Sequence, residues 1–320
     1  MCTDHDERAQ MINVLFAAPA QQWDAYHAPL SRAFASVGIG VNLSRSHAAA
    51  AVDYLIYVPG GPVTDFTPFT RARAVLSLWA GVEKIVTNPS LHLPLARMVD
   101  PGLAQGMVEY VTGHVLRHHL GMDADIIGHS SGNWVQRRVP LAAERPVTVL
   151  GLGELGRACA RMLAQIGFPV TGWSQSAKTI PGLHCLSGPV GLTSALRGAQ
   201  IIVSLLPLTP ETTDILNAET LALPARGAAI INPGRGALID DAALLAALDS
   251  GQIGHATLDV FRTEPLPRDD PFWAHPRITV TPHIAAETRP DTASQVIADN
   301  IRRAEAGEPM LYLVDRSKGY

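Results

Sequence analysis

The fold of this chain is decided at residues 146–156, which read Pro-Val-Thr-Val-Leu-Gly-Leu-Gly-Glu-Leu-Gly. An apolar run at 147–150 leads directly into the glycines, and a helical pattern of apolar residues follows over 155–166. A strand, a glycine turn and a helix in this order give the spacing Gly-x-Gly-x-x-Gly its meaning. The first glycine permits a tight turn, the second lets a pyrophosphate approach the backbone, and the third lets the helix pack closely. The segment therefore predicts a dinucleotide phosphate site, formed by Gly151, Gly153, Glu154, Leu155 and Gly156.

The composition bounds the class of protein. The length of 320 residues is typical of two domains, and 47% hydrophobic with 17% charged residues is typical of a globular chain. A net charge of −4 gives no electrostatic sign of nucleic-acid binding, and no apolar run approaches the roughly 18 residues of a membrane span. The acidic residues 1–8 do not resemble a secretory signal. The three widely spaced cysteines predict no metal site and fit a reducing, cytoplasmic setting.

Short apolar runs alternate with helical patterns along the chain, which predicts parallel α/β sheets. The first part has strand patterns at 13–18, 52–58 and 74–78 and a helical pattern at 23–37, and it contains no phosphate loop. From 146 onward the repeating units predict a Rossmann-type, doubly wound parallel sheet. Its expected strands lie at 147–150, 170–173, 201–206, 229–232, 256–260 and 278–281.

A long helix is expected at 105–120, and it carries three histidines. His114 and His118 are four residues apart, a spacing that zinc can use, but no Glu completes a zinc motif. We therefore expect packed or solvent-facing histidines. The polar stretch 125–140, which contains Trp134, is expected to connect elements or to pack on the surface.

Polar side chains follow three successive strands of the predicted sheet, at the edge where ligands of such sheets bind. They include Arg235 after the strand at 229–232, Glu264 after 256–260, and His283 after 278–281. A guanidinium can grip a carboxylate with two prongs, and an imidazole can donate a proton as hydride reaches a carbonyl carbon. A carboxylate on the far ring nitrogen fixes the imidazole tautomer. This set suits hydride transfer to a 2-keto acid, although each residue singly could be a surface charge, a turn cap or a packed histidine.

These segments resemble the D-2-hydroxyacid dehydrogenases, from 151–156 through 232–236 and 259–267 to 281–286. Within that family the chain is most similar to the glyoxylate/hydroxypyruvate reductase group, a similarity that includes 172–174, 204–212 and the tail at 314–316 and 318–320. The resemblance implies NADPH-dependent reduction of small 2-keto acids such as glyoxylate and hydroxypyruvate to D-2-hydroxy acids. Arg235, Glu264 and His283 would be catalytic, with His283 as the acid/base.

The resemblance also implies an organisation. A flavodoxin-like α/β substrate domain would span 1–102, completed by 286–320, with a cleft to the dinucleotide-binding domain at 103–285. Family members are commonly homodimers. The substrate would contact Arg235 and the backbone around Trp79, Ala80 and Gly81, although Trp79 stands where relatives often have a small residue. Further cofactor contacts would come from Leu206, Pro207, Thr212, Asn232, Pro233 and Asp259.

The choice of nicotinamide cofactor depends on the end of the second strand of the predicted sheet. An NAD site usually has an acidic residue about 20 residues past the glycines, whereas this chain has none over 172–178. A 2′-phosphate would meet no repulsion there, and it could accept hydrogen bonds from Ser174, Gln175, Ser176 and Lys178. The similar reductases usually have Arg at the position of Gln175. NADP(H) is therefore favoured, with NAD(H) as the alternative.

Three other functions compete with this interpretation. A corepressor of the same fold would sense nicotinamide nucleotides, and it could retain the three site residues while binding peptides. A dehydrogenase for a bulkier D-2-hydroxy acid would share the chemistry. A formate-oxidising relative fits poorly because it carries Gln where Glu264 stands.

Overall fold

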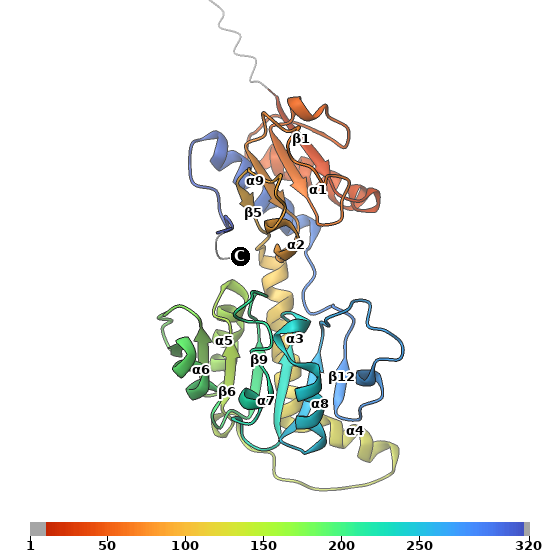
Figure 1. Ribbon diagram of the computed structural model, residues 1–320, viewed down its shortest axis with the longest axis vertical. Coiled ribbons are helices and arrows are strands. Elements are labelled where there is room, and N and C mark those ends of the chain that lie inside the picture. Colours follow the sequence, from red (N-terminus) through yellow and green to blue (C-terminus); the bar gives the residue numbers. More distant parts are fainter. Residues whose placement is uncertain (1–10, 317–320) are drawn as a thin grey trace, which may run out of the picture. The chain divides into compact units, whose positions relative to one another are not determined.

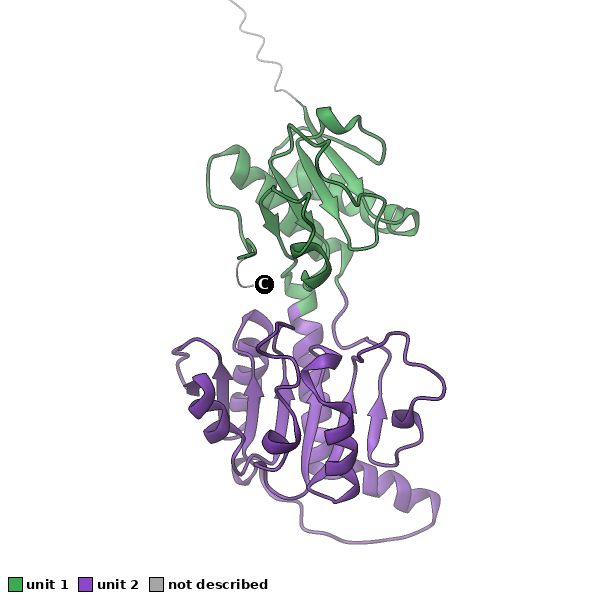
Figure 2. Ribbon diagram, viewed as in Figure 1, with its two compact units in different colours: residues 1–103, 288–320 green, residues 104–287 purple. Residues whose placement is uncertain are grey.

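The structure is a computed structural model that describes residues 11–316. The chain divides into two compact units, shown in Figure 2: unit 1 comprises 1–103 with 288–320, and unit 2 comprises 104–287. These limits lie one and two residues from the boundaries expected from the sequence. The acidic residues 1–8, Cys2 and the tail residues 318–320 lie outside the described residues.

Unit 1 is a five-stranded parallel sheet (Figure 1). Its strands are β1 (Ile12–Ala17), β2 (Val41–Ser44), β3 (Tyr54–Tyr57), β4 (Ala74–Ser77) and β5 (Leu95–Ala96). They lie in the order β2-β1-β3-β4-β5, which is the flavodoxin-like order of a doubly wound sheet. The smaller α/β domain expected from the sequence therefore has the expected architecture.

Both ends of the chain build the core of unit 1. Helix α1 (Ala20–Ser36) contributes Leu30 and Phe34, and helix α9 (Pro290–Glu305) contributes Ile297 and Ile301. All four side chains pack in one buried cluster with residues of β1 and β3. The opposite face of the sheet is covered by the segments around 63–72 and by the short helix α2 (Glu83–Val86).

Unit 2 is a seven-stranded parallel sheet in the order β12-β11-β10-β9-β6-β7-β8. The strands are β6 (Val147–Leu150), β7 (Val170–Ser174), β8 (His184–Ser187), β9 (Ile201–Ser204), β10 (Ala228–Asn232), β11 (Ile253–Leu258) and β12 (Ile278–Val280). The chain starts at β6, winds outward to β8, and then returns to β9 on the other side of β6. This reversal is the switch point at which doubly wound sheets bind ligands, and it confirms the Rossmann-type prediction.

Helices cover both faces of this sheet, which explains why its central strands β6, β9 and β10 are buried along their whole length. On one face, α3 (Pro101–Leu120) and α5 (Glu154–Ile166) bury Val111, Val115 and Leu163. On the other, α6 (Gly188–Leu196), α7 (Ala218–Leu221) and α8 (Asp241–Asp249) bury Leu196, Leu221, Leu244 and Leu248. Asp240 caps α8 by accepting the Ala243 N–H at 3.0 Å. Cys159 is buried on α5 as expected, and burial raises the pKa of its thiol to about 12.

One segment differs from its prediction. The polar stretch 125–140, expected to connect elements or to pack on the surface, overlaps the helix α4 (Met122–Ser130), which begins directly after Gly121 in a left-handed conformation. Asp123 and Asp125 lie in the first turn of α4, where carboxylates are favoured, and they pair with Arg117 and Arg137. The edge strand β8 was not predicted, because its sequence His-Cys-Leu-Ser lacks an apolar run. Within residues 11–316, no helix combines the length and the hydropathy needed to span a bilayer.

Candidate active site

The turn between β6 and α5 contains the three glycines of the motif, and the space around each shows why glycine is needed there. A Cβ on Gly151 would lie 2.5 Å from the Leu205 carbonyl oxygen, and one on Gly156 would lie 1.7 Å from the Gly151 oxygen. Both positions therefore require glycine for the turn itself. A Cβ on Gly153 would meet nothing within 4 Å, so this glycine borders open space at the start of α5. Gly153 has no side chain to cap the helix, so the N–H groups of the first turn remain available to a phosphate. The residues of this turn therefore fit the dinucleotide pyrophosphate that the glycine motif implies.

The side chain of Glu154 stands in this first turn and pairs with Arg157 at 2.5 Å. The arginine offsets a negative charge that would otherwise repel a phosphate. Leu206 is buried in the loop after β9. Thr212 braces the same loop, because its hydroxyl donates to the Pro207 carbonyl at 2.7 Å and accepts the Thr209 N–H at 2.8 Å.

The end of β7 holds the residues that were expected to meet a 2′-phosphate. Ser174 is buried, and its hydroxyl donates its single proton to the Ser176 carbonyl at 2.8 Å. Its hydroxyl is therefore engaged within the turn and does not donate outward, in contrast to the expectation. Gln175, Ser176 and Lys178 are exposed.

The loop after β10 fixes the position of Arg235. Asn232 is buried, and its amide donates to the Arg235 carbonyl at 2.9 Å and accepts the Gly234 N–H at 3.2 Å. A Cβ on Gly236 would lie 2.1 Å from the Phe261 carbonyl carbon, so the loops after β10 and β11 touch at this point. The half-buried Arg235 side chain donates to the Gly234 carbonyl at 2.7 Å. Pro233 and Gly234 thus leave the arginine at the carboxyl edge of the sheet.

His283 and Glu264 form a direct pair at the same edge. The imidazole Nδ1 lies 2.7 Å from Glu264 Oε2, and Glu264 Oε1 accepts the Phe261 N–H at 2.9 Å. An ionised carboxylate can only accept, so Nδ1 carries the proton and Nε2 is left for chemistry. The backbone of His283 has a φ of 53°, which is uncommon for any residue except glycine.

Asp259 fixes the backbone turn at 281–285, which carries His283, by hydrogen bonds. It is completely buried, and its carboxylate accepts the Ile284 and Ala285 N–H groups, each at 2.9 Å. It also accepts the Thr281 hydroxyl at 2.5 Å, while the Asp259 carbonyl accepts the His283 N–H at 2.9 Å. Neither Asp259 nor its partner Thr281 stood out from the sequence as a support for His283. The sequence feature that could have indicated this support is an Asp at the end of one predicted strand, Asp259, with Thr281-Pro-His283 at the end of the next.

In unit 1, Trp79, Ala80 and Gly81 follow β4. Ser77 Oγ accepts the Trp79 N–H at 3.0 Å, and the Trp79 carbonyl accepts the Met98 N–H at 3.0 Å, so the backbone here is held on both sides. Among residues 11–316, no acceptor is found for the backbone N–H groups of Ala80, Gly81 and Val82. These donors suit a carboxylate. The Trp79 side chain is 42% exposed.

The histidines of α3 are packed, as expected. His118 Nε2 lies 2.9 Å from the Thr257 hydroxyl, and the His118 ring packs on His255 with 5.1 Å between ring centroids. Burial, with a smaller contribution from His255, lowers the pKa of His118 to about 3. Within the described part of the chain, no group of His, Cys, Asp or Glu side chains could hold a metal ion.

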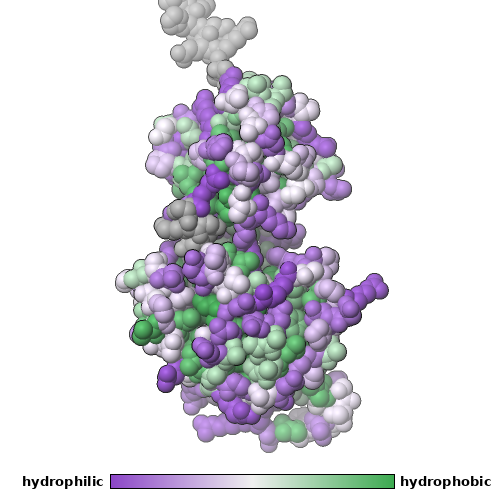
Figure 3. All heavy atoms as spheres, viewed as in Figure 1, coloured by the Kyte–Doolittle hydropathy of each residue, from purple (hydrophilic) through white to green (hydrophobic). Residues whose placement is uncertain are grey.

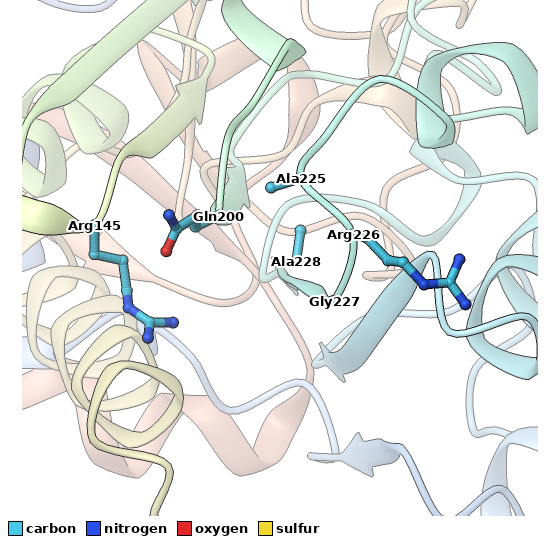
Figure 4. A pocket seen from close by; sticks show the side chains of 6 residues that line it. All are labelled: Arg145, Gln200, Ala225, Arg226, Gly227 and Ala228. Carbon is cyan, nitrogen blue, oxygen red and sulfur yellow. The ribbon is translucent and has the colours of Figure 1, made fainter. Parts of the chain in front are cut away.

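A pocket of about 340 Å³ lies at the opposite edge of the unit 2 sheet, where β6, β9 and β10 begin (Figure 4). Its lining includes Arg145, Gln200 and Arg226, whose side chains Figure 4 shows as sticks. Arg226 donates to the Ser250 carbonyl at 2.6 Å. This pocket is remote from the carboxyl ends of the strands, where doubly wound sheets bind ligands, and we do not assign the chemistry to it.

The family model for the D-isomer specific 2-hydroxyacid dehydrogenase, NAD binding domain, matches residues 113–285. The chain belongs to this family. The glyoxylate/hydroxypyruvate reductase A of Serratia proteamaculans is 41% identical over 257 residues, which cover 78% of this chain and 82% of that protein. The resemblance inferred from the motifs is therefore confirmed.

Solved structures of this D-2-hydroxyacid dehydrogenase family have the same fold. A family member from Xanthobacter autotrophicus Py2, in complex with NADPH and MES, is 40% identical with a TM-score of 0.90, covering 97% of this chain and 100% of that chain. The NADPH-dependent glyoxylate/hydroxypyruvate reductase of Sinorhizobium meliloti, in complex with NADP and sulfate, is 34% identical with a TM-score of 0.84, covering 97% and 99%. The two-domain α/β fold class is thus confirmed.

Proposed function

We propose that this dehydrogenase reduces small 2-keto acids, such as glyoxylate and hydroxypyruvate, to D-2-hydroxy acids with NADPH. The observation that carries the proposal is the 2.7 Å contact between His283 Nδ1 and Glu264 Oε2 at the carboxyl edge of a Rossmann-type sheet. Similarity to reductases that are named for these substrates supports the choice of substrate.

Proton transfer falls to His283. When bound, the nicotinamide supplies the hydride that reaches the carbonyl carbon of the keto acid. The protonated His283 donates the Nε2 proton to the carbonyl oxygen, and the product alcohol leaves with that proton. Glu264 accepts from Nδ1 throughout, so it fixes the tautomer and stabilises the charged ring. In the oxidative direction the neutral ring takes the proton back.

Arg235 orients the substrate in this proposal. Its planar fork matches a carboxylate with two parallel hydrogen bonds, and its charge polarises the adjacent carbonyl. In unit 1, the backbone N–H groups of Ala80 and Gly81, for which no acceptor is found among residues 11–316, are further donors of a kind that binds carboxylates. The pairing of a carboxylate grip with a proton donor restricts the substrate class to 2-keto and 2-hydroxy acids.

We assign the cofactor site to the carboxyl edge of β6, β7, β9 and β10. The N–H groups of Gly153–Gly156 would hold the pyrophosphate, and Gln175, Ser176 and Lys178 would hold the 2′-phosphate. Since the side chains of Thr212, Asn232 and Asp259 are engaged within the protein, these residues would shape the nicotinamide site together with Leu206 and Pro233.

We also infer a cytoplasmic homodimer. Large apolar side chains are exposed on α4 and the segment that follows it, and Trp134 is 92% exposed. Hydrophobic residues are visible among polar ones in this region of the surface (Figure 3, compare α4 in Figure 1). A second copy of the chain would bury them, and an exposed apolar patch of this kind marks an interaction site.

Analytical ultracentrifugation tests this inference, and we expect the parent protein to sediment as a dimer. Ile127→Asp should dissociate the dimer, whereas the control Val190→Asp, on an exposed residue of α6, should leave it intact. A monomeric parent protein would contradict the inference.

The activity is tested directly with purified protein, NADPH and a panel of 2-keto acids, by following NADPH absorbance. We expect turnover of glyoxylate and hydroxypyruvate above that of bulkier keto acids. Binding of NADPH without turnover of any keto acid would refute the proposal and favour a nucleotide-sensing role.

A further inference from the structure

Helix α3 and the His283 turn are joined by a chain of side-chain hydrogen bonds. The Tyr110 hydroxyl lies 2.7 Å from the Thr281 hydroxyl, which lies 2.5 Å from Asp259 Oδ1. Asp259 is completely buried, and Tyr110 stands in a largely apolar interface between α3 and the sheet. Polar chains in such surroundings are retained only when every member is satisfied.

The chain has a defined direction. The Asp259 carboxylate accepts the N–H of Ile284 on one oxygen and that of Ala285 on the other. Thr281 has a single hydroxyl proton, which goes to the carboxylate, so Tyr110 must donate to Thr281. Burial, as the largest cause, raises the pKa of Tyr110 above its ordinary value, so the phenol keeps its proton.

We propose that Tyr110 and Thr281 are positioning residues for His283, acting through the Asp259 carboxylate. This inference rests on the proposed function of His283 as proton donor. His283 adopts a left-handed backbone conformation, with φ 53°, that persists only where its surroundings hold it. Asp259 supplies that restraint by accepting three backbone N–H groups: its carbonyl accepts that of His283, and its carboxylate accepts those of Ile284 and Ala285.

Thr281 and Tyr110 act on His283 indirectly, by fixing the Asp259 carboxylate. The Thr281 hydroxyl fixes the rotation of the carboxylate, and the Tyr110 hydroxyl fixes the rotamer of Thr281. If either hydroxyl is removed, the carboxylate can turn, and the N–H groups of Ile284 and Ala285 lose their aligned acceptors. The imidazole then samples positions away from the keto oxygen, and a misplacement of about 1 Å can cost roughly 100-fold in rate.

The test uses substitutions that remove or keep a single hydroxyl group with little change of the side chain. Thr281→Val replaces only the hydroxyl, Thr281→Ser keeps it, and Tyr110→Phe removes the outer donor. The matched control is Thr257→Val, which removes the buried threonine hydroxyl that contacts His118 on the same α3 face. Thr257 lies on β11, outside the 281–285 turn.

We expect Thr281→Val to lower kcat for glyoxylate reduction by roughly 10- to 100-fold and Tyr110→Phe to lower it less. The KM for NADPH should stay unchanged, Thr281→Ser should restore most of the rate, and Thr257→Val should retain it. Equal kcat losses in Thr281→Val and Thr257→Val, or failure of Thr281→Ser to recover activity, would overturn the proposal.

A second measurement does not depend on activity. Backbone hydrogen exchange at Ile284 and Ala285 should accelerate at least ~10-fold in Tyr110→Phe and Thr281→Val, relative to Thr257→Val. Unchanged exchange at both amides would overturn the proposal even in an inactive protein. Absence of reductase activity in the parent protein with accelerated exchange in the variants would instead refute only the proposed function. Tyr110→Phe keeps the test available if Thr281→Val does not fold.

Discussion

Burial of His118 should make the stability of the protein fall as the medium becomes acidic. The pKa of His118 is lowered from the usual 6.5 to about 3, chiefly because the ring is removed from water and secondly because His255 lies against it. A depressed pKa in the folded state means that the unfolded chain binds the proton more readily. The stabilising contribution is therefore complete above pH 6.5 and is lost progressively as the pH falls towards 3.

The size of the effect follows from these two values. Protonation of this one ring in the unfolded state lowers the free energy of unfolding by about 2 kcal/mol at pH 5 relative to pH 7. At very low pH the full loss is about 5 kcal/mol. We expect the free energy of unfolding, measured by urea denaturation at pH 7 and pH 5, to fall about 2 kcal/mol less in His118→Gln than in the parent protein. His184→Gln, on the exposed edge strand β8, serves as the matched control for a histidine-to-glutamine change outside this buried cluster.

His114 and His255 lie beside His118, and burial also lowers the pKa of each, so part of the acid sensitivity should remain in His118→Gln. Parallel pH dependences in His118→Gln and the parent protein would show that the ring is not held neutral by burial, and the reasoning would be refuted.

Four further predictions concern the site. Arg235→Lys should lower kcat/KM for glyoxylate by roughly 10- to 100-fold while NADPH affinity changes little, because an ammonium lacks the planar fork; near-normal kinetics would remove Arg235 as the carboxylate anchor. The parent protein should use NADPH better than NADH, and Ser174→Asp should shift the ratio of the two kcat/KM values towards NADH; better use of NADH by the parent protein would contradict the 2′-phosphate assignment. Gly153→Ala should leave the melting temperature unchanged, since its Cβ meets nothing within 4 Å, yet weaken NADPH binding in a fluorescence titration; unaltered binding would place the pyrophosphate elsewhere. His283→Ala should lower kcat by at least ~100-fold, and Glu264→Gln should lower it less, because an amide oxygen can still accept from Nδ1 but brings no negative charge to the ring; full activity in Glu264→Gln would leave Glu264 as a turn cap.

The parts of the fold that could be predicted are those specified by local sequence. The turn at Gly151–Gly156 needs glycine for reasons within a few residues, and buried parallel strands such as β9 and β10 are apolar on both faces. The strand ends that carry Arg235, Glu264 and His283 could be located because parallel strands end at one edge. The pairing of His283 with Glu264 follows from the same geometry.

The parts that could not be predicted depend on partners far along the chain. Tyr110 reads as an ordinary helix residue, and its partner Thr281 is 171 positions away. The polar composition of 125–140 predicts a connection or a surface segment and gives no sign of the helix α4, and the pair that Arg137 forms with Asp125 is visible only in the structure. Ser174 was expected to donate outward, whereas its proton goes to a carbonyl two residues on, a choice that composition does not reveal.

The contribution of α9 to the core of unit 1 has a consequence for synthesis on the ribosome. Leu30, Phe34 and the inner face of β1 have no complete cover until Ile297 and Ile301 have emerged, about 190 residues after Leu103. At roughly 5–20 residues per second, the first 103 residues wait on the order of 10–40 s, during which the whole of unit 2 is made and can fold. Unit 2 is therefore expected to be the first to reach its native state, although unit 1 leads the chain. A nascent chain stalled before residue 290 would carry an unfinished apolar surface, which makes the first unit synthesised the one most dependent on chaperones.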